Sequence, residues 1–230
     1  MNAGRLVGIL GGTFDPVHEG HLAAAAAAAD AVGLDEVLFI ASHEPPHRRL
    51  PPRASAYHRF AMVSMAVTAD ARFSASDLEL RRTGPSFTAD TLRRLHAPNL
   101  QAWQLFFITG TDAFAEIATW HDYPALLDLA NFVVISRPGQ TLDKLASRLP
   151  DLAQRMQSLA TGDWRPQKAS TRILLVEAAT PDVSSTEIRE RLAAGGALTG
   201  LVPSSVESHI RRHRLYDSRE GGRRAAQGDC

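Results

Sequence analysis

Short apolar runs alternate with amphipathic segments along most of the chain. The runs are short enough to favour strands over helices, and they lie at residues 6–10, 37–41, 103–109, 131–136 and 173–177. The run at 37–41 is apolar throughout, as expected for a central parallel strand that is covered on both faces. Strands that alternate with helices form a parallel sheet with right-handed crossovers. We therefore predict an α/β fold built on a single, doubly wound parallel sheet with helices on both faces.

The segments between these runs predict the helices and the limits of the domain. Helices are expected from Glu19 through the alanine run at 23–29 and over 57–69, and residues 84–92 enter a further helix that ends before Pro98. Two more are expected from 183 onward and over 203–212. The last of these forms a small C-terminal helical part. Residues 73–80 alternate weakly and are interpreted as an edge strand, and the polar stretch 141–170 as an insertion or a surface excursion. We expect one domain over 1–216, and a disordered tail over 217–230 because that segment is polar and contains glycines.

The first predicted strand ends in a pair of glycines that is followed by a helix. Gly11 and Gly12 let the backbone approach a ligand closely, and the start of the helix offers unpaired N–H groups, so the turn predicts a phosphate site. His18 and His21 are three residues apart on the first helical turn, so both imidazoles point towards this turn. Two histidines at this spacing could also be metal ligands or satisfied polar residues. Zinc needs further ligands that are not found nearby, so no protein metal site is expected.

The eleven residues from Gly11 to His21 resemble the signature of the nucleotidyltransferase superfamily with the His-x-Gly-His motif. Within this segment, the sequence Thr-Phe-Asp-Pro is most similar to that of the bacterial nicotinate-nucleotide adenylyltransferases. The resemblance implies a Rossmann-like fold in which this segment binds the phosphates of ATP. It assigns a catalytic role to His18 and His21, and ATP binding to Gly11, Gly12, Thr13, Phe14, His18 and His21. For Asp15 it implies contact with nicotinate mononucleotide.

The proline-rich segment 42–53 follows the second predicted strand. Its prolines exclude regular structure, so a surface loop is the default interpretation. Loops at the carboxyl ends of parallel strands also build the binding crevice of such sheets. Pro45-Pro46-His47-Arg48 resembles the family's Pro-Pro-His-Lys, which implies that His47 and Arg48 face the mononucleotide. Arg48 replaces the usual lysine, which keeps the charge but not the geometry.

The resemblance implies binding roles for residues in further segments of the chain. Taken alone, Ser86 or Thr88 is a helix N-cap, Asp112 is another N-cap, and Trp120 is a core residue. The family's motifs assign Ser86, Phe87, Thr88, Trp120 and Arg137 to nicotinate mononucleotide, and Gly110 and Asp112 to ATP. For Asp112 the cap and the binding role can coexist. His121 follows Trp120 where relatives often have tyrosine.

The segment from Val183 to Arg189 predicts a second helix start that can hold phosphate. Ser184 and Glu187 fit a capping box. Ser185, Thr186 and Arg189 add hydroxyls and a guanidinium that suit a triphosphate. The segment also resembles the superfamily's Ser-Ser-Thr-x-Ile-Arg motif, which implies ATP binding by Val183, Ser184, Ser185, Thr186 and Arg189, with Arg189 also catalytic.

Composition excludes several other classes of protein. The 230 residues include 25 basic and 25 acidic side chains, so net charge gives no argument for nucleic-acid binding. No apolar run approaches the length of a membrane span, and the one cysteine, Cys230, cannot form an intrachain disulfide. We expect a cytoplasmic protein without nucleic-acid or membrane partners. The sequence leaves a homo-oligomer open.

The resemblance implies one reaction and leaves two alternatives. The expected activity is transfer of the adenylyl group of ATP to nicotinate mononucleotide, which gives nicotinate adenine dinucleotide and pyrophosphate. Magnesium is expected as a cofactor that is bound with ATP. The chain could instead prefer nicotinamide mononucleotide, or be a regulatory module that binds nucleotides without turnover.

Overall fold

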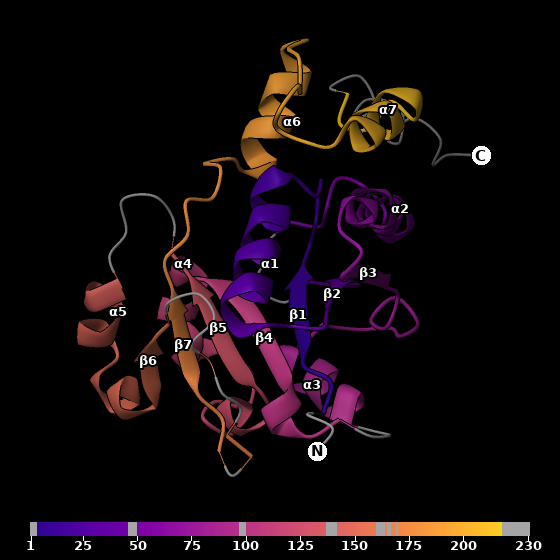
Figure 1. Cartoon of the computed structure of the whole chain (residues 1–230). Coiled ribbons are helices and arrows are strands. Elements are labelled where there is room, and N and C mark those ends of the chain that lie inside the picture. The colour runs from indigo at the N-terminus through magenta and orange to yellow at the C-terminus, as the bar shows by residue number, and fades with distance from the viewer. Residues whose placement is uncertain are drawn as a thin grey trace.

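A computed structural model describes residues 4–45, 50–96, 100–136, 142–159, 164, 167–168 and 170–217. Its centre is one parallel sheet of seven strands (Figure 1). The strands are β1 (Val7–Gly12), β2 (Glu36–Ala41), β3 (Phe73–Ser76), β4 (Leu105–Gly110), β5 (Asn131–Ile135), β6 (Met156–Ser158) and β7 (Ile173–Val176).

Helices connect the strands. They are α1 (Glu19–Val32), α2 (Ala56–Ala66), α3 (Thr88–His96), α4 (Thr111–Ala115), α5 (Leu142–Arg148), α6 (Ser185–Ala193) and α7 (Ser204–Arg212). Short 3-10 helices lie at Val67–Ala69, Ala102–Gln104, Ile117–Thr119, Ala125–Asp128 and Pro150–Arg155. Among the described residues, no helix has both the length and the apolar character that crossing a membrane requires.

The order of the strands places a binding crevice near β1. The order is β3-β2-β1-β4-β5-β7-β6, so the chain moves outward in one direction from β1 to β3 and in the other from β4 onward. The register of β1 and β2 pairs Gly12 with Ala41, and that of β4 and β5 pairs Gly110 with Ile135. The inner strands therefore end at one edge, and the reversal between β1 and β4 is where such sheets bind ligands.

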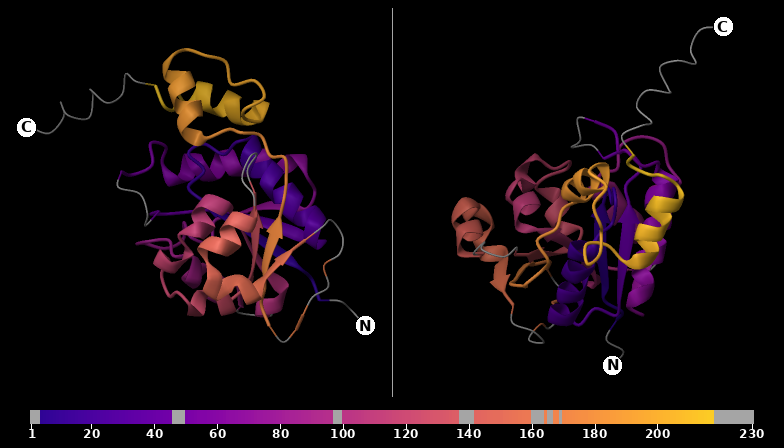
Figure 2. Two further views of the ribbon diagram at one scale, coloured as in Figure 1. Left: turned by 90° about the vertical axis from the view of Figure 1, so that its left-hand side faces the viewer. Right: turned by 90° about the horizontal axis from the view of Figure 1, so that it is seen from above.

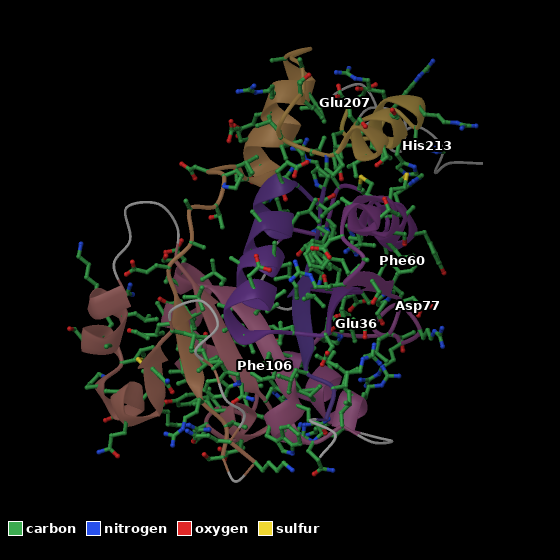
Figure 3. The ribbon with its side chains drawn as sticks, in the orientation of Figure 1. Glu36, Phe60, Asp77, Phe106, Glu207 and His213 are labelled. Carbon is green, nitrogen blue, oxygen red and sulfur yellow. The ribbon has the colours of Figure 1, made fainter. Side chains whose placement is uncertain are left out.

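Two hydrophobic cores cover the two faces of the sheet. One contains Leu10, Phe106 and Ile135 together with apolar residues of α1, α2, α6 and α7, and Figure 3 labels Phe106 in this core and Phe60 of α2 packed against it. The other contains Ile9, Phe107 and Phe132 with residues of α3, α4 and α5. The predicted doubly wound sheet with helices on both faces is confirmed. Figure 2 shows α6 and α7 as a cap beyond one end of the sheet, which agrees with a small C-terminal helical part.

Alanines allow α1 to lie close to the sheet. Ala25, Ala28 and Ala29 are buried, and small side chains on one helical face permit a short distance between helix and strands. The helix ends at Gly33, whose φ of 76° is left-handed and whose N–H donates to the Ala29 carbonyl at 2.8 Å. Glycine accepts this conformation readily because it lacks a Cβ.

The region 141–170 adds an element that the sequence did not indicate. Residues Met156–Ser158 form β6, which pairs in parallel with β7 at one edge of the sheet. The expected strand over 73–80 is an edge strand but ends at Ser76. The described part of 141–170 therefore extends the main sheet, and the predicted domain limits stay a prediction. The predicted tail, apart from Asp217, lies outside the described residues.

Gly8 gives a test of packing in the centre of the sheet. A Cβ at this position would lie 2.7 Å from Leu34 Cδ1 and 3.1 Å from Ile108 Cδ1, both of which are buried. We expect Gly8→Ala to lower the free energy of unfolding by about 1–3 kcal/mol through overpacking, as measured by urea denaturation. Gly110→Ala is the matched control, because no atom lies within 4 Å of its added Cβ. Equal stability of the two variants would contradict this account.

Candidate active site

The turn between β1 and α1 carries the polar residues that the sequence singled out. β1 ends at Gly12 and α1 begins at Glu19, so residues 13–18 form a loop at the carboxyl edge of the sheet. Phe14 is buried and has a φ of 50°, a conformation that residues other than glycine rarely adopt. Its ring meets His21 edge to face, with centroids 5.0 Å apart.

His18 and His21 form a pair at the start of α1. Their rings are stacked with centroids 3.6 Å apart, and the backbone N–H of His18 donates to Nδ1 of His21 at 3.2 Å. Because Nδ1 accepts a hydrogen bond, the proton of a neutral His21 ring is on Nε2. His21 can therefore present an N–H donor to an anion, as the sequence predicted for a phosphate ligand.

The start of α6 is bound to the same loop. Ser184 caps the helix by accepting the Glu187 N–H at 3.1 Å, which confirms the predicted cap. The Ser185 hydroxyl donates to the Pro16 carbonyl at 2.9 Å. Arg189 donates from Nη1 to the Asp15 carbonyl at 2.7 Å and from Nη2 to the Thr186 hydroxyl at 3.0 Å. Segments that lie far apart in the sequence are thus joined at one edge of the sheet.

A cavity of about 340 Å³ lies between these segments. His18, Gly20 and His21 line one wall, the ends of β4 and β5 line another, and residues 180–186 complete the lining. The imidazole pair and the hydroxyl-bearing start of α6 therefore face one shared space. Donors on both sides and a helix N-terminus are the features that favour polyphosphate binding.

A second cluster of predicted site residues gathers on the other face of the sheet. Ser86 accepts the His43 N–H at 2.9 Å and donates its own N–H to the Glu44 carbonyl, which joins the loop after β2 to the start of α3. Phe87 stacks on His121 with ring centroids 4.3 Å apart. Trp120 is half-buried and meets Phe107 edge to face. Aromatic rings and polar loop atoms thus lie together, as a pocket for a planar ring requires.

Ionisable groups near this second cluster are perturbed by their surroundings. Burial raises the pKa of Glu79, although its hydrogen bonds with Thr91 and Ser86 act in the opposite direction. The hydrogen bond from Arg93 lowers the pKa of Asp122, whose carboxylate lies 2.6 Å from that guanidinium. Asp122 in turn directly follows His121, so charge pairing fixes the chain beside the stacked rings.

Gly11 lies between the two clusters. Its neighbour Leu10 lines the cavity, and a Cβ at Gly11 would lie 3.5 Å from the Phe107 ring of the aromatic cluster. The backbone at the end of β1 is therefore shared by both sides. Two ligands that each occupied one cluster would meet beside the glycine turn.

Comparisons with known proteins agree with this geometry. The sequence matches the cytidylyltransferase-like family over residues 9–191. A protein of Chromobacterium violaceum, described as a probable nicotinate-nucleotide adenylyltransferase, is 43% identical over 216 residues, which cover 94% of this chain and 100% of that protein. A protein of Desulfatibacillum aliphaticivorans with the same description is 40% identical over 91% of this chain and 99% of its own length.

The chain belongs to the nicotinate-nucleotide adenylyltransferase family. Among solved structures, the Plasmodium falciparum nicotinic acid mononucleotide adenylyltransferase complexed with APC superposes with a TM-score of 0.66 at 17% identity, covering 92% of this chain and 97% of that one. At this identity the likeness supports the fold. The resemblance that the signature residues predicted is confirmed.

The structure brings only part of the predicted adenylyltransferase site to the cavity. Its lining includes His18, His21, Gly110 and the residues 183–186. Gly11, Gly12, Thr13, Phe14, Asp112 and Arg189 are not part of the described lining. Asp112 is exposed in the first turn of α4, where Gly110 is the N-cap, so the alternative of Asp112 as the N-cap is wrong.

Several predicted contacts with the mononucleotide stay predictions. His47, Arg48 and Arg137 lie outside the described residues. Ser86, Phe87, Thr88 and Trp120 lie around the second cluster. The side chain of Asp15 is 1% exposed, and its oxygens accept hydrogen bonds from within the protein.

Arg59 is an important residue that the sequence analysis missed. It is 1% exposed on α2, and its guanidinium donates to the carbonyls of Thr13 at 2.6 Å and Ser42 at 2.7 Å. It therefore connects the loop after β1 to the loop after β2. A signal was present, because residue 59 lies on the same helical stripe as the buried Met62, Val63 and Ala66. A charged residue on such a stripe indicates a buried partner.

Arg59 allows this connection to be tested. Arg59→Met keeps much of the apolar stem but leaves buried carbonyls without their donor, so we expect the free energy of unfolding to fall by at least about 2 kcal/mol. Urea denaturation measures the change, and Arg212→Met on the exposed face of α7 is the control. The account is wrong if both variants are equally stable.

Proposed function

We propose that this protein transfers the adenylyl group of ATP to nicotinate mononucleotide, which gives nicotinate adenine dinucleotide and pyrophosphate. The observation that carries the proposal is the cavity shared by the His18–His21 pair and the start of α6. Relatives described as probable nicotinate-nucleotide adenylyltransferases support the substrates, as does a related solved structure described as complexed with NaAD.

The reaction needs no covalent intermediate on the protein. An oxygen of the mononucleotide 5′-phosphate attacks the α-phosphorus of ATP in line, a new P–O bond forms, and the bond to the β-phosphate oxygen breaks. The electron pair of that bond leaves with pyrophosphate. Because the nucleophile is already an anion, the protein contributes by positioning two anionic reactants and by stabilising developing charge.

The phosphate groups are held from both sides of the cavity. His18 and His21 donate to the α-phosphate and stabilise the transition state, and the Nε2–H of His21 is oriented by the hydrogen bond at Nδ1. Thr186 and Arg189 bind the β- and γ-phosphates at the start of α6. Gly110 and Asp112 hold the adenosine, while the backbone from Gly11 to Phe14 lies beside the reacting phosphates.

The mononucleotide occupies the aromatic side of the glycine turn. Trp120 stacks on the pyridine ring, and Ser86, Phe87 and Thr88 form the adjoining wall. His47, Arg48 and Arg137 supply positive charge to its phosphate and carboxylate. Asp15 supports this region from the loop after β1.

Magnesium accompanies the triphosphate in this proposal. Within the part of the chain that the structure describes, no three His, Cys, Asp or Glu side chains gather to hold a metal ion. The donors that are present fit an ion held mainly by phosphate oxygens and water, with the Asp182 carboxylate in the cavity lining. When bound, magnesium neutralises charge on the phosphates. We further propose a cytoplasmic location and no nucleic-acid partner, with a homo-oligomer as an open alternative.

A coupled assay tests the activity and the choice of substrate. The protein is incubated with magnesium, ATP and either nicotinate or nicotinamide mononucleotide, and pyrophosphate and dinucleotide are measured. We expect turnover with the acid to exceed turnover with the amide. Equal rates would contradict the acid preference, and no pyrophosphate with either substrate would favour a nucleotide-binding regulatory module.

The paired histidines give a direct test of the mechanism. Removal of one preorganised donor to a transition state lowers kcat by about 100-fold or more, so we expect this loss for His18→Ala and for His21→Ala, with a smaller change in the KM for ATP. Steady-state kinetics and circular dichroism separate a catalytic loss from unfolding. His213→Ala is the control, because His213 is exposed at the end of α7 and is not part of the cavity lining (Figure 3). Near-normal kcat in the His21 variant would overturn its assigned role.

A further inference from the structure

The carboxylate of Asp15 is buried at the centre of the loop between β1 and α1. Its Oδ2 accepts the Arg53 N–H at 2.9 Å. Its Oδ1 accepts the Ala54 N–H at 3.0 Å and the hydroxyl of Tyr216 at 2.9 Å. A buried carboxylate requires such donors to offset its loss of hydration. Asp15 thus connects its own loop to residues 53–54 and to the segment after α7.

Tyr216 reaches Asp15 through an unusual backbone path. It lies just past α7, is 7% exposed, and has a φ of 70°, while Arg214 has a φ of 50°. Residues with side chains adopt these left-handed conformations rarely, and they persist where the surrounding structure determines them. Burial and the neighbouring Asp15 carboxylate raise the pKa of Tyr216 above its usual value. The hydroxyl therefore keeps its proton and is the donor in this bond.

The loop that Asp15 holds determines where the paired histidines lie. Arg59 binds the Thr13 carbonyl, Arg189 binds the Asp15 carbonyl, and Ser185 binds the Pro16 carbonyl. Between these points Phe14 is held in a left-handed conformation with its ring against His21. A shift of Asp15 therefore moves the backbone on both sides of it, including the ring that packs on His21.

We propose that Tyr216 is a positioning residue for adenylyl transfer: its hydroxyl fixes the Asp15 carboxylate, and Asp15 fixes the loop that orients His18 and His21. This inference rests on the function proposed above and deepens it. Tyr216 touches neither substrate and acts through Asp15. Its contribution is geometric, because a displacement of about 1 Å in a reacting group can lower a rate by about 100-fold.

Tyr216→Phe tests the inference by removing one oxygen atom and keeping the ring. We expect kcat to fall by between about 10-fold and about 100-fold, with little change in the KM for ATP. Histidine side-chain NMR spectra should show a shift of the His21 signals. The signals of His96, which contacts the Leu129 carbonyl elsewhere in the fold, should stay in place. Tyr57→Phe is the matched control, because Tyr57 is 81% exposed; its kcat should equal that of the unaltered protein.

Asp15→Asn probes the same contact from the other side. It replaces one carboxylate oxygen by an amide NH2 group that cannot accept, so either the Arg53 N–H at Oδ2, or the Ala54 N–H and the Tyr216 hydroxyl at Oδ1, lose their acceptor. The same selective loss of kcat is expected. The double variant should lose less than the product of the two single losses, because both changes weaken the same anchoring of the loop. This non-additivity would not arise from two independent losses of stability.

The outcomes separate the inference from the proposed function. Unchanged kcat in a folded Tyr216→Phe variant overturns the inference, whatever its melting temperature, and leaves the proposed function in place. If that variant does not fold, unchanged kcat in Asp15→Asn overturns it equally. Failure of both variants to fold at the assay temperature would also overturn it, since the pair would then serve the whole fold. If the unaltered protein does not form dinucleotide, the proposed function itself is wrong.

Discussion

The structure depends on satisfying the polar groups of one short loop between β1 and α1. Residues 13–18 leave the sheet beside buried strand ends, where water cannot serve their carbonyl oxygens. An unpaired polar group in such surroundings is costly. Arg59 from α2, with Ser185 and Arg189 from α6, supplies the missing donors. The shape of the loop is therefore a property of the whole domain, and the histidine pair takes its orientation from helices that are distant in sequence.

The parallel sheet places one cluster of site residues on each of its two faces, with the loop between β1 and α1 at the edge. The connection after β1 leads to β2 on one side, and the connection after β4 leads to β5 on the other side. This reversal leaves an opening beyond the carboxyl ends of β1 and β4. One face of the sheet carries the cavity with the imidazoles, and the other carries Phe87, Trp120 and His121. Gly11 and Gly12 at the end of β1 have no side chains, so groups on the two faces of the sheet can approach one another there. The fold thus suits a reaction that joins two separately bound nucleotides.

Much of this organisation was accessible from the sequence, for physical reasons. Strands β1, β2, β4, β5 and β7 each contain a run of mostly apolar residues, and local composition is enough to reveal them. The rule that parallel strands end at one edge predicts that His18, His21, Asp112, Ser184 and Arg189 share one cleft. His18, His21 and Ser184 line the cavity, whereas Asp112 and Arg189 are not part of its described lining. β6 was missed because Met156–Ser158 is a short and partly polar segment whose strand state comes from pairing with β7. Tyr216 was missed because its significance depends on a partner 201 positions away. No periodicity encodes such a contact.

The separation of 201 positions between Asp15 and Tyr216 has a consequence for folding during synthesis. A chain is synthesised from its N-terminus, and the seven strands of the described sheet all precede Tyr216. The architecture that holds nucleotides can therefore assemble while the carboxylate at position 15 still lacks its last donor. Arrival of the C-terminal segment supplies this donor, so one of the last described residues of the chain completes the hydrogen bonds of one of its first loops.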